Sequence, residues 1–194
     1  MPGLSEEGRG KAAGIVALYP ERRSAMIPLC HLAQGEHGYL SEEAMEEIAG
    51  LTGVTPAEVR GTASFYEMLH TEPVGRYLLG FCTNIACMLA GAYELLEHAE
   101  EHLGARVGQT TPDGLFTLEE AECLAACDAA PCVQVNHRFV GALGIEGFDE
   151  LVAELRSGRR GEEIPAHGVL CRVERSVGLT AGRSATGPAG GPGS

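Results

Sequence analysis

The chain has 194 residues, 44% of them hydrophobic, and a formal net charge of −13. The hydrophobic share is enough for a buried core, whereas a negative charge without a basic stripe argues against binding nucleic acid. The sequence shows neither a secretory signal nor a run of about 18 uncharged apolar residues, so we expect a cytoplasmic location and no direct membrane insertion.

Residues 8–70 predict a helical amino-terminal region. Pro20 ends a first helix by Tyr19, because the residue before a proline disfavours helical geometry. Ser41 predicts the N-cap of a later helix, and Thr55-Pro56-Ala57-Glu58 predicts a capping box with proline at the first helical position. Phe65, near the end of the region, is predicted to lie in the core. The region contains no catalytic constellation.

From Arg76 onward the pattern changes to short apolar runs and amphipathic helices. The predicted elements are a strand over 77–81, a helix over 89–103, strands over 115–118, 132–135 and 138–143, and a helix from Phe148 to Ser157. The last two strands are joined by a tight turn at Asn136-His137. The order β-α-β-β-β-α predicts an α/β sandwich of thioredoxin-like type.

The expected fold class is therefore α+β. We predict an N-terminal helical bundle over residues 1–73, a thioredoxin-like α/β domain over 74–160, and a C-terminal extension over 161–194. The extension has the composition of a flexible segment from about residue 176.

Four of the seven cysteines form two close pairs. Four residues separate Cys82 from Cys87, three separate Cys123 from Cys127, and 35 residues lie between the pairs. In a reducing compartment, such pairs favour metal or redox chemistry over disulfides. Four thiolates are the ligands of a [2Fe–2S] cluster, but structural zinc sites use the same ligands at similar spacings. Spacing alone leaves both open.

Residues around the first pair suit a cluster. Cys87 precedes the predicted helix, whose free amide groups can offset thiolate charge. Small residues such as Ala86, Ala90 and Gly91 let the backbone approach inorganic sulfur, and this close approach is the predicted reason for a glycine inside the helix.

The remaining candidates are weaker. Cys30, Cys132 and Cys171 lack partners at ligand spacing and are interpreted as small hydrophobic residues. His98 and His102 stand at positions i and i+4 of the predicted helix, a geometry that can hold a metal. They lie opposite its apolar side, so a solvated face is the favoured interpretation.

Three segments over residues 61–66, 73–77 and 82–91 resemble the NuoE family, the thioredoxin-like [2Fe–2S] subunit of bacterial respiratory complex I (NADH-quinone oxidoreductase). Residues 113–117 followed by 122–127 resemble the second signature of that family, and the matches span about residues 15–158.

The resemblance implies a thioredoxin-like domain of the [2Fe–2S] ferredoxin type. It assigns Cys82, Cys87, Cys123 and Cys127 as the four cluster ligands, and one-electron transfer as the function. The chain alone would hold no complete active site. Its partners would be a flavoprotein subunit that carries FMN and binds NADH, together with other peripheral-arm subunits, on the cytoplasmic side of the inner membrane.

Two positions depart from the family pattern. Ala125 stands where glycine is common, and Cys132 stands where an apolar residue such as methionine is usual. Two alternatives stay open: the small [2Fe–2S] subunit of an NAD-linked hydrogenase or formate dehydrogenase and, from a different class, a zinc-stapled structural subunit.

Overall fold

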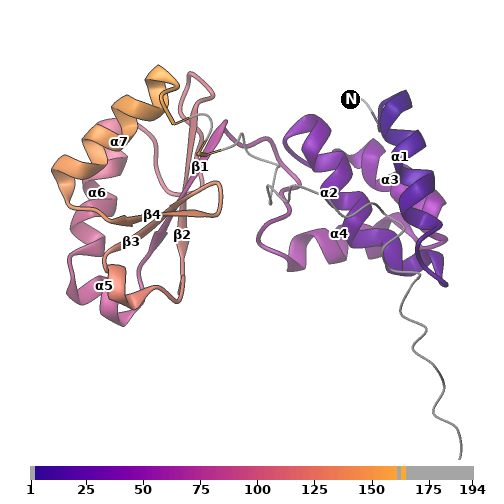
Figure 1. Cartoon of the computed structure of the whole chain (residues 1–194), viewed down its shortest axis with the longest axis horizontal. Coiled ribbons are helices and arrows are strands. Elements are labelled where there is room, and N and C mark those ends of the chain that lie inside the picture. Colours follow the sequence, from indigo (N-terminus) through magenta and orange to yellow (C-terminus); the bar gives the residue numbers. More distant parts are fainter. Residues whose placement is uncertain (1–2, 161–162, 165–194) are drawn as a thin grey trace, which may run out of the picture.

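The chain folds into a helical part and a sheet-containing part, each with its own hydrophobic core (Figure 1). We describe residues 3–160 and 163–164 of a computed structural model. The helical part contains α1 (Glu6–Val16), the 3₁₀ turn η1 (Arg22–Ala25), α2 (Met26–His37), α3 (Glu42–Thr52) and α4 (Pro56–Phe65). The second part contains β1 (Tyr77–Cys82), α5 (Ile85–Leu89), α6 (Ala92–Leu103), β2 (Phe116–Ala121), η2 (Cys127–Ala129), β3 (Cys132–Val135), β4 (Arg138–Ala142) and α7 (Ile145–Ser157). The predicted α+β class is confirmed.

Local capping sets the helix ends of the first part, as predicted. The Ser41 hydroxyl accepts a hydrogen bond from the Ala44 amide at 3.1 Å and so begins α3. The capping box of Thr55 and Glu58 is present in both directions at the start of α4. Gly38 ends α2 in the left-handed conformation, at φ 80°.

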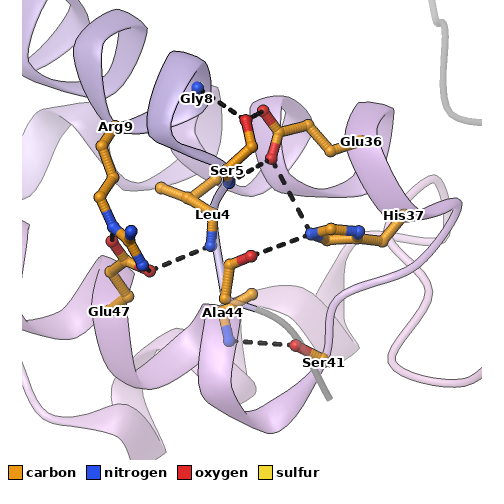
Figure 2. Close-up of polar contacts among 10 residues, drawn as sticks. Leu4, Ser5, Gly8, Arg9, Glu36, His37, Ser41, Ala44 and Glu47 are labelled. Atoms are coloured by element: carbon orange, nitrogen blue, oxygen red, sulfur yellow. Dashed lines mark hydrogen bonds and ion pairs between the residues drawn. The ribbon is translucent and has the colours of Figure 1, made fainter.

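Polar contacts hold the first described residues onto α2 and α3 (Figure 2). The Leu4 amide donates to a Glu47 carboxylate oxygen at 3.0 Å, and Arg9 pairs with the same carboxylate at 2.6 Å. The Ser5 amide and hydroxyl both donate to Glu36, at 2.9 and 2.7 Å. These contacts hold the start of the chain in place, and the Leu4 side chain is buried in the helical core.

The sheet has the strand order β2-β1-β3-β4. Strands β1 and β2 run parallel, in a register that starts at Tyr77 opposite Phe116 and ends at Cys82 opposite Ala121. Strands β1 and β3 are antiparallel, as are β3 and β4. Since two parallel neighbours finish at the same edge, the loops that follow β1 and β2 leave the sheet together, and β3 begins at that edge.

The two faces of the sheet have different surroundings. Helices α6 and α7 pack on the face that carries Leu79 and Phe81, where they build the main core (Figure 1). The opposite face, with Leu78 and Gly80, lines a cleft of about 350 Å³. Glu67, from the segment between α4 and β1, also lines this cleft, so that segment lies over the second face.

Three expectations were wrong. The predicted helix over 89–103 is broken into α5 and α6 at Gly91, which has φ +93°. A Cβ there would meet only Glu94, at 3.6 Å, so the left-handed backbone rather than a close approach calls for glycine. The break leaves Leu89 79% exposed. Phe65 is also 79% exposed and not in the core.

The predicted boundary between residues 73 and 74 falls in the segment that connects α4 to β1. The flexible tail predicted from about residue 176, and Cys171, lie outside the described residues. Within the described part of the chain, no helix combines the length and the apolar character needed to cross a membrane.

Candidate metal centre

The parallel pair of strands brings the two cysteine pairs to one end of the sheet. Cys82 is the last residue of β1 and lies opposite Ala121, the last residue of β2. Cys123 follows two residues later, and the Cys82 thiol reaches the carbonyl oxygen of Glu122, next to Cys123, at 3.9 Å. Residues 40 apart in the sequence are therefore neighbours.

The two pairs differ in burial. Cys82 and Cys87 are buried, whereas Cys123 and Cys127 are exposed. The first pair is fixed by β1 and the short helix α5, and the second lies in the loop that ends in η2. The site is thus anchored in the protein on one side and open to the surface on the other.

The surroundings shift the pKa values of the two buried thiols in opposite directions. Burial alone would raise the pKa of the Cys82 thiol. Hydrogen bonds from the backbone amides of Leu124 and Asn84, and one from the Cys87 side chain, outweigh burial and lower it. The pKa of Cys87 is raised, by burial first, then by its hydrogen bond with Cys82 and by the charges of Cys82 and Cys127. A cationic centre would remove this conflict by holding the sulfurs as thiolates.

The loop of the second pair is tightly turned. Ala125 has φ 56°, in the left-handed region that favours glycine. Alanine is therefore accommodated there at some cost in strain. Ala126 and Ala130 pack against the buried thiols. Four thiols from two loops, backbone amide donors and small flanking residues together fit an iron–sulfur cluster.

Cys132 provides a fifth thiol beside the site. It is buried with Cys82 and Cys87 in one cluster, and its backbone amide donates to the Cys87 sulfur. Burial is the main cause that raises the pKa of Cys132 to about 11. Cys30 lies in the helical core, where burial also raises its pKa to about 11. Both behave as hydrophobic side chains in this structure.

Sequence reasoning missed an apolar surface next to the site. Ile85, Met88, Leu89 and Tyr93 are exposed by 43–79% on α5 and at the start of α6. The first three flank Cys87 within α5. Helical spacing gave no sign of this, because Leu89 and Tyr93 fitted the apolar side of one continuous helix. The break at Gly91 turns them outward.

Comparison with known proteins agrees with this fold and site. A family model described as thioredoxin-like [2Fe–2S] ferredoxin matches residues 12–156. A chain of Rhizobium meliloti named as a subunit of NADH-quinone oxidoreductase is 45% identical over 152 residues, 78% of this chain and 90% of the relative. NADH-quinone oxidoreductase subunit 2 of Thermus thermophilus is 44% identical over 155 residues, 78% of this chain and 86% of the relative.

Among solved structures, an NAD⁺-reducing [NiFe]-hydrogenase in the air-oxidized state aligns with a TM-score of 0.64 and 25% identity. The alignment covers 72% of this chain but 24% of the hydrogenase chain. The fold and the family match together define a thioredoxin-like iron–sulfur protein. The chain belongs to the thioredoxin-like [2Fe–2S] ferredoxin family, and its resemblance to the NuoE family is confirmed by these NADH-quinone oxidoreductase relatives.

Proposed function

We propose that this chain is the electron-transfer subunit of an NADH-quinone oxidoreductase. In this proposal Cys82, Cys87, Cys123 and Cys127 ligate one [2Fe–2S] cluster. The observation that carries it is the parallel pairing of β1 with β2, which ends at Cys82 opposite Ala121 and brings both cysteine loops to one sheet edge.

Each part of the site has a task in this function. When bound, a [2Fe–2S] cluster takes up and releases one electron at a time. The buried thiols of Cys82 and Cys87 fix its position, and the amides of Leu124 and Asn84 stabilise negative charge on sulfur. The exposed loop of Cys123 and Cys127 keeps the other side close to the surface, where a partner can approach.

We assign the exposed apolar residues of α5 to partner contact. Ile85, Met88 and Leu89 surround Cys87 in sequence, so a protein docked on them lies directly against the site. The partner proposed is the flavoprotein subunit that binds NADH and carries FMN, within the peripheral arm on the cytoplasmic side of the inner membrane. Relatives named as subunits of NADH-quinone oxidoreductase support such an assembly.

A second candidate is the corresponding module of an NAD-linked hydrogenase. It is favoured by the alignment with the NAD⁺-reducing [NiFe]-hydrogenase, of which this chain spans about a quarter. The identity of 25% to that chain is well below the 45% to the Rhizobium meliloti relative. Co-purification of the native chain distinguishes the two, since one assembly contains a nickel subunit and the other does not.

The test is the metal content of protein purified without oxygen. We expect about two irons per chain and a brown colour that dithionite bleaches. Cys82→Ser and Cys123→Ser each remove a proposed ligand, so bound iron should fall well below one per chain. A colourless protein whose one zinc per chain is lost in Cys82→Ser and Cys123→Ser would instead establish the zinc-stapled alternative.

Cys132→Ala is the matched control. It removes a buried thiol from the same cluster of side chains but keeps the backbone amide that donates to Cys87. Iron content should stay at the wild-type level. If Cys132→Ala loses iron while Cys123→Ser keeps it, the ligand set proposed here is wrong.

A further inference from the structure

Helices α6 and α7 bring together three side chains of the kinds that can bind a metal. His98 and His102 are four residues apart on α6 and therefore lie one turn apart on the same side of the helix. Asp149 reaches them from α7. His98 Nε2 lies 2.7 Å from Asp149 Oδ1, and His102 Nδ1 lies 3.3 Å from the same oxygen.

Both imidazole rings pack against one buried aromatic ring. Both rings meet the Phe148 ring nearly edge-on, with centroids 6.1 and 6.3 Å away. Phe148 is itself fully buried and directly precedes Asp149 on α7. The His98 and His102 side chains are 26% and 37% exposed. The expected solvated face is therefore partly covered: α7 packs over His98, whereas His102 is exposed.

We propose that His98, His102 and Asp149 form a binding site for a divalent transition-metal ion, with zinc as the best-matched probe. One nitrogen of each histidine and one carboxylate oxygen lie within 4.8 Å of one another, in the only such group of three or more among the described residues. Imidazole and carboxylate are ligands of borderline metals such as Zn²⁺. Three protein ligands leave one tetrahedral position for water or for a partner's side chain.

The two nitrogen–oxygen separations require only a small adjustment. Tetrahedral zinc with ligand distances of about 2.0 Å separates its ligand atoms by about 3.3 Å. The His102–Asp149 distance of 3.3 Å already matches. The His98–Asp149 distance of 2.7 Å is that of a hydrogen bond, and it must open by roughly half an ångström as the ion replaces the shared proton. Asp149 can supply this movement because its side chain is 42% exposed.

The site is independent of the proposed cluster. Its ligands come from α6 and α7, whereas the cysteine pairs lie in the loops that follow β1 and β2. It therefore does not rest on the electron-transfer function. An ion here would join α6 to α7 across the face of the core.

The test is zinc binding by the full chain purified with its iron–sulfur cluster, so that the cysteines are occupied. Equilibrium dialysis against Zn²⁺, with iron measured in the same samples, should give one zinc per chain in addition to the iron. His102→Gln and Asp149→Asn each remove one ligand from a different helix, and each should weaken zinc binding at least tenfold.

Glu101→Gln is the control, because it removes a charge from the exposed surface of α6 next to His102 without removing a ligand. It should bind zinc like the wild type. Circular dichroism and the iron content establish that each variant is folded. The proposal is overturned if the wild type binds no zinc, or if His102→Gln and Asp149→Asn bind it as tightly as the wild type.

Discussion

Both regions of the molecule use a buried side-chain amide to hold the segment between α4 and β1. The two residues differ in backbone conformation: one is helical and the other is left-handed. In the helical region, Gln34 on α2 is fully buried. Its Nε2 donates to the Met68 carbonyl at 2.7 Å, and its Oε1 accepts from the His70 amide at 2.8 Å. The beginning of the connecting segment is fixed in this way.

In the sheet domain, Asn136 does the same at the other end. Its Nδ2 donates to the Arg76 carbonyl at 3.0 Å, and its Oδ1 accepts from the Leu78 amide at 2.7 Å. Its own backbone amide also donates to the Leu78 carbonyl at 2.9 Å. Asn136 is in the left-handed conformation, at φ 50°, in the turn between β3 and β4.

Gln34 and Asn136 meet different structural requirements. Gln34 lies inside a regular helix, so only its side chain is specific. Asn136 meets a side-chain and a backbone requirement at once, since asparagine tolerates the left-handed region better than most residues. Substitutions at Asn136 should therefore cost more than substitutions at Gln34, and the extra cost should depend on the backbone.

The largest effect is expected for Asn136→Ala. It leaves a buried amide and a partly buried carbonyl without side-chain partners and places alanine at φ 50°. The expected loss in the free energy of unfolding is about 2–5 kcal/mol. Urea unfolding followed by circular dichroism measures it.

Asn136→Gly tests the backbone part. Glycine loses the same hydrogen bonds but accepts the left-handed conformation without strain. It should recover about 1 kcal/mol relative to Asn136→Ala. Equal stability of the two variants would show that the conformation adds nothing to the requirement at this position.

A smaller effect is expected for Gln34→Leu. The Met68 carbonyl and the His70 amide lose their partner, but the helical backbone is unaffected, so the loss should be about 1–3 kcal/mol. Hydrogen exchange followed by mass spectrometry should show faster exchange in the peptide around residues 66–72 and little change in β1. Equally faster hydrogen exchange in β1 would mean that Gln34 and Asn136 do not stabilise separate parts of the chain.

The parts of the fold that follow from local chemistry were predictable from the sequence. The capping box at Thr55, the N-cap at Ser41 and the tight turn at Asn136-His137 depend on residues a few positions apart. Strand β3 lies where it was predicted because its apolar run is short and bounded by Pro131 and that turn.

Features that depend on distant contacts were not predictable in the same way. Gly91 fitted a continuous helix, and nothing in the helical spacing indicates that it adopts φ +93°. The contact of Asp149 with His98 and His102 requires knowing that α7 packs beside α6. The two cysteine pairs lie at one end of the sheet because β1 and β2 are parallel neighbours, a pairing that was not predicted. The spacing left the ligand set open, and only the family resemblance implied it.

The smallest predicted effect is on the pH dependence of stability, and it concerns His70 in the segment between α4 and β1. Burial and the nearby His137 lower the pKa of His70 to about 4. Burial and His137 also lower the pKa of His31, and burial lowers that of His137. In the unfolded chain a histidine titrates near its ordinary pKa of about 6.5.

Between pH 6.5 and 4 the unfolded state therefore binds more protons than the folded state, and stability falls as the pH is lowered through this window. Glu119 opposes this trend, because burial and the nearby Glu67 raise its pKa. His70 is partly exposed to solvent, so we expect its share to be about 1–2 kcal/mol, below the value that the full shift would give.

The measurement is urea unfolding of the wild type and of His70→Gln at pH 7 and pH 5. The variant keeps the backbone amide that Gln34 binds but cannot take up a proton. Its stability should fall less between the two pH values than that of the wild type. Loss of the cluster in acid would affect both proteins alike, so the difference between them isolates the histidine. Parallel losses would show that His70 does not contribute to the acid sensitivity.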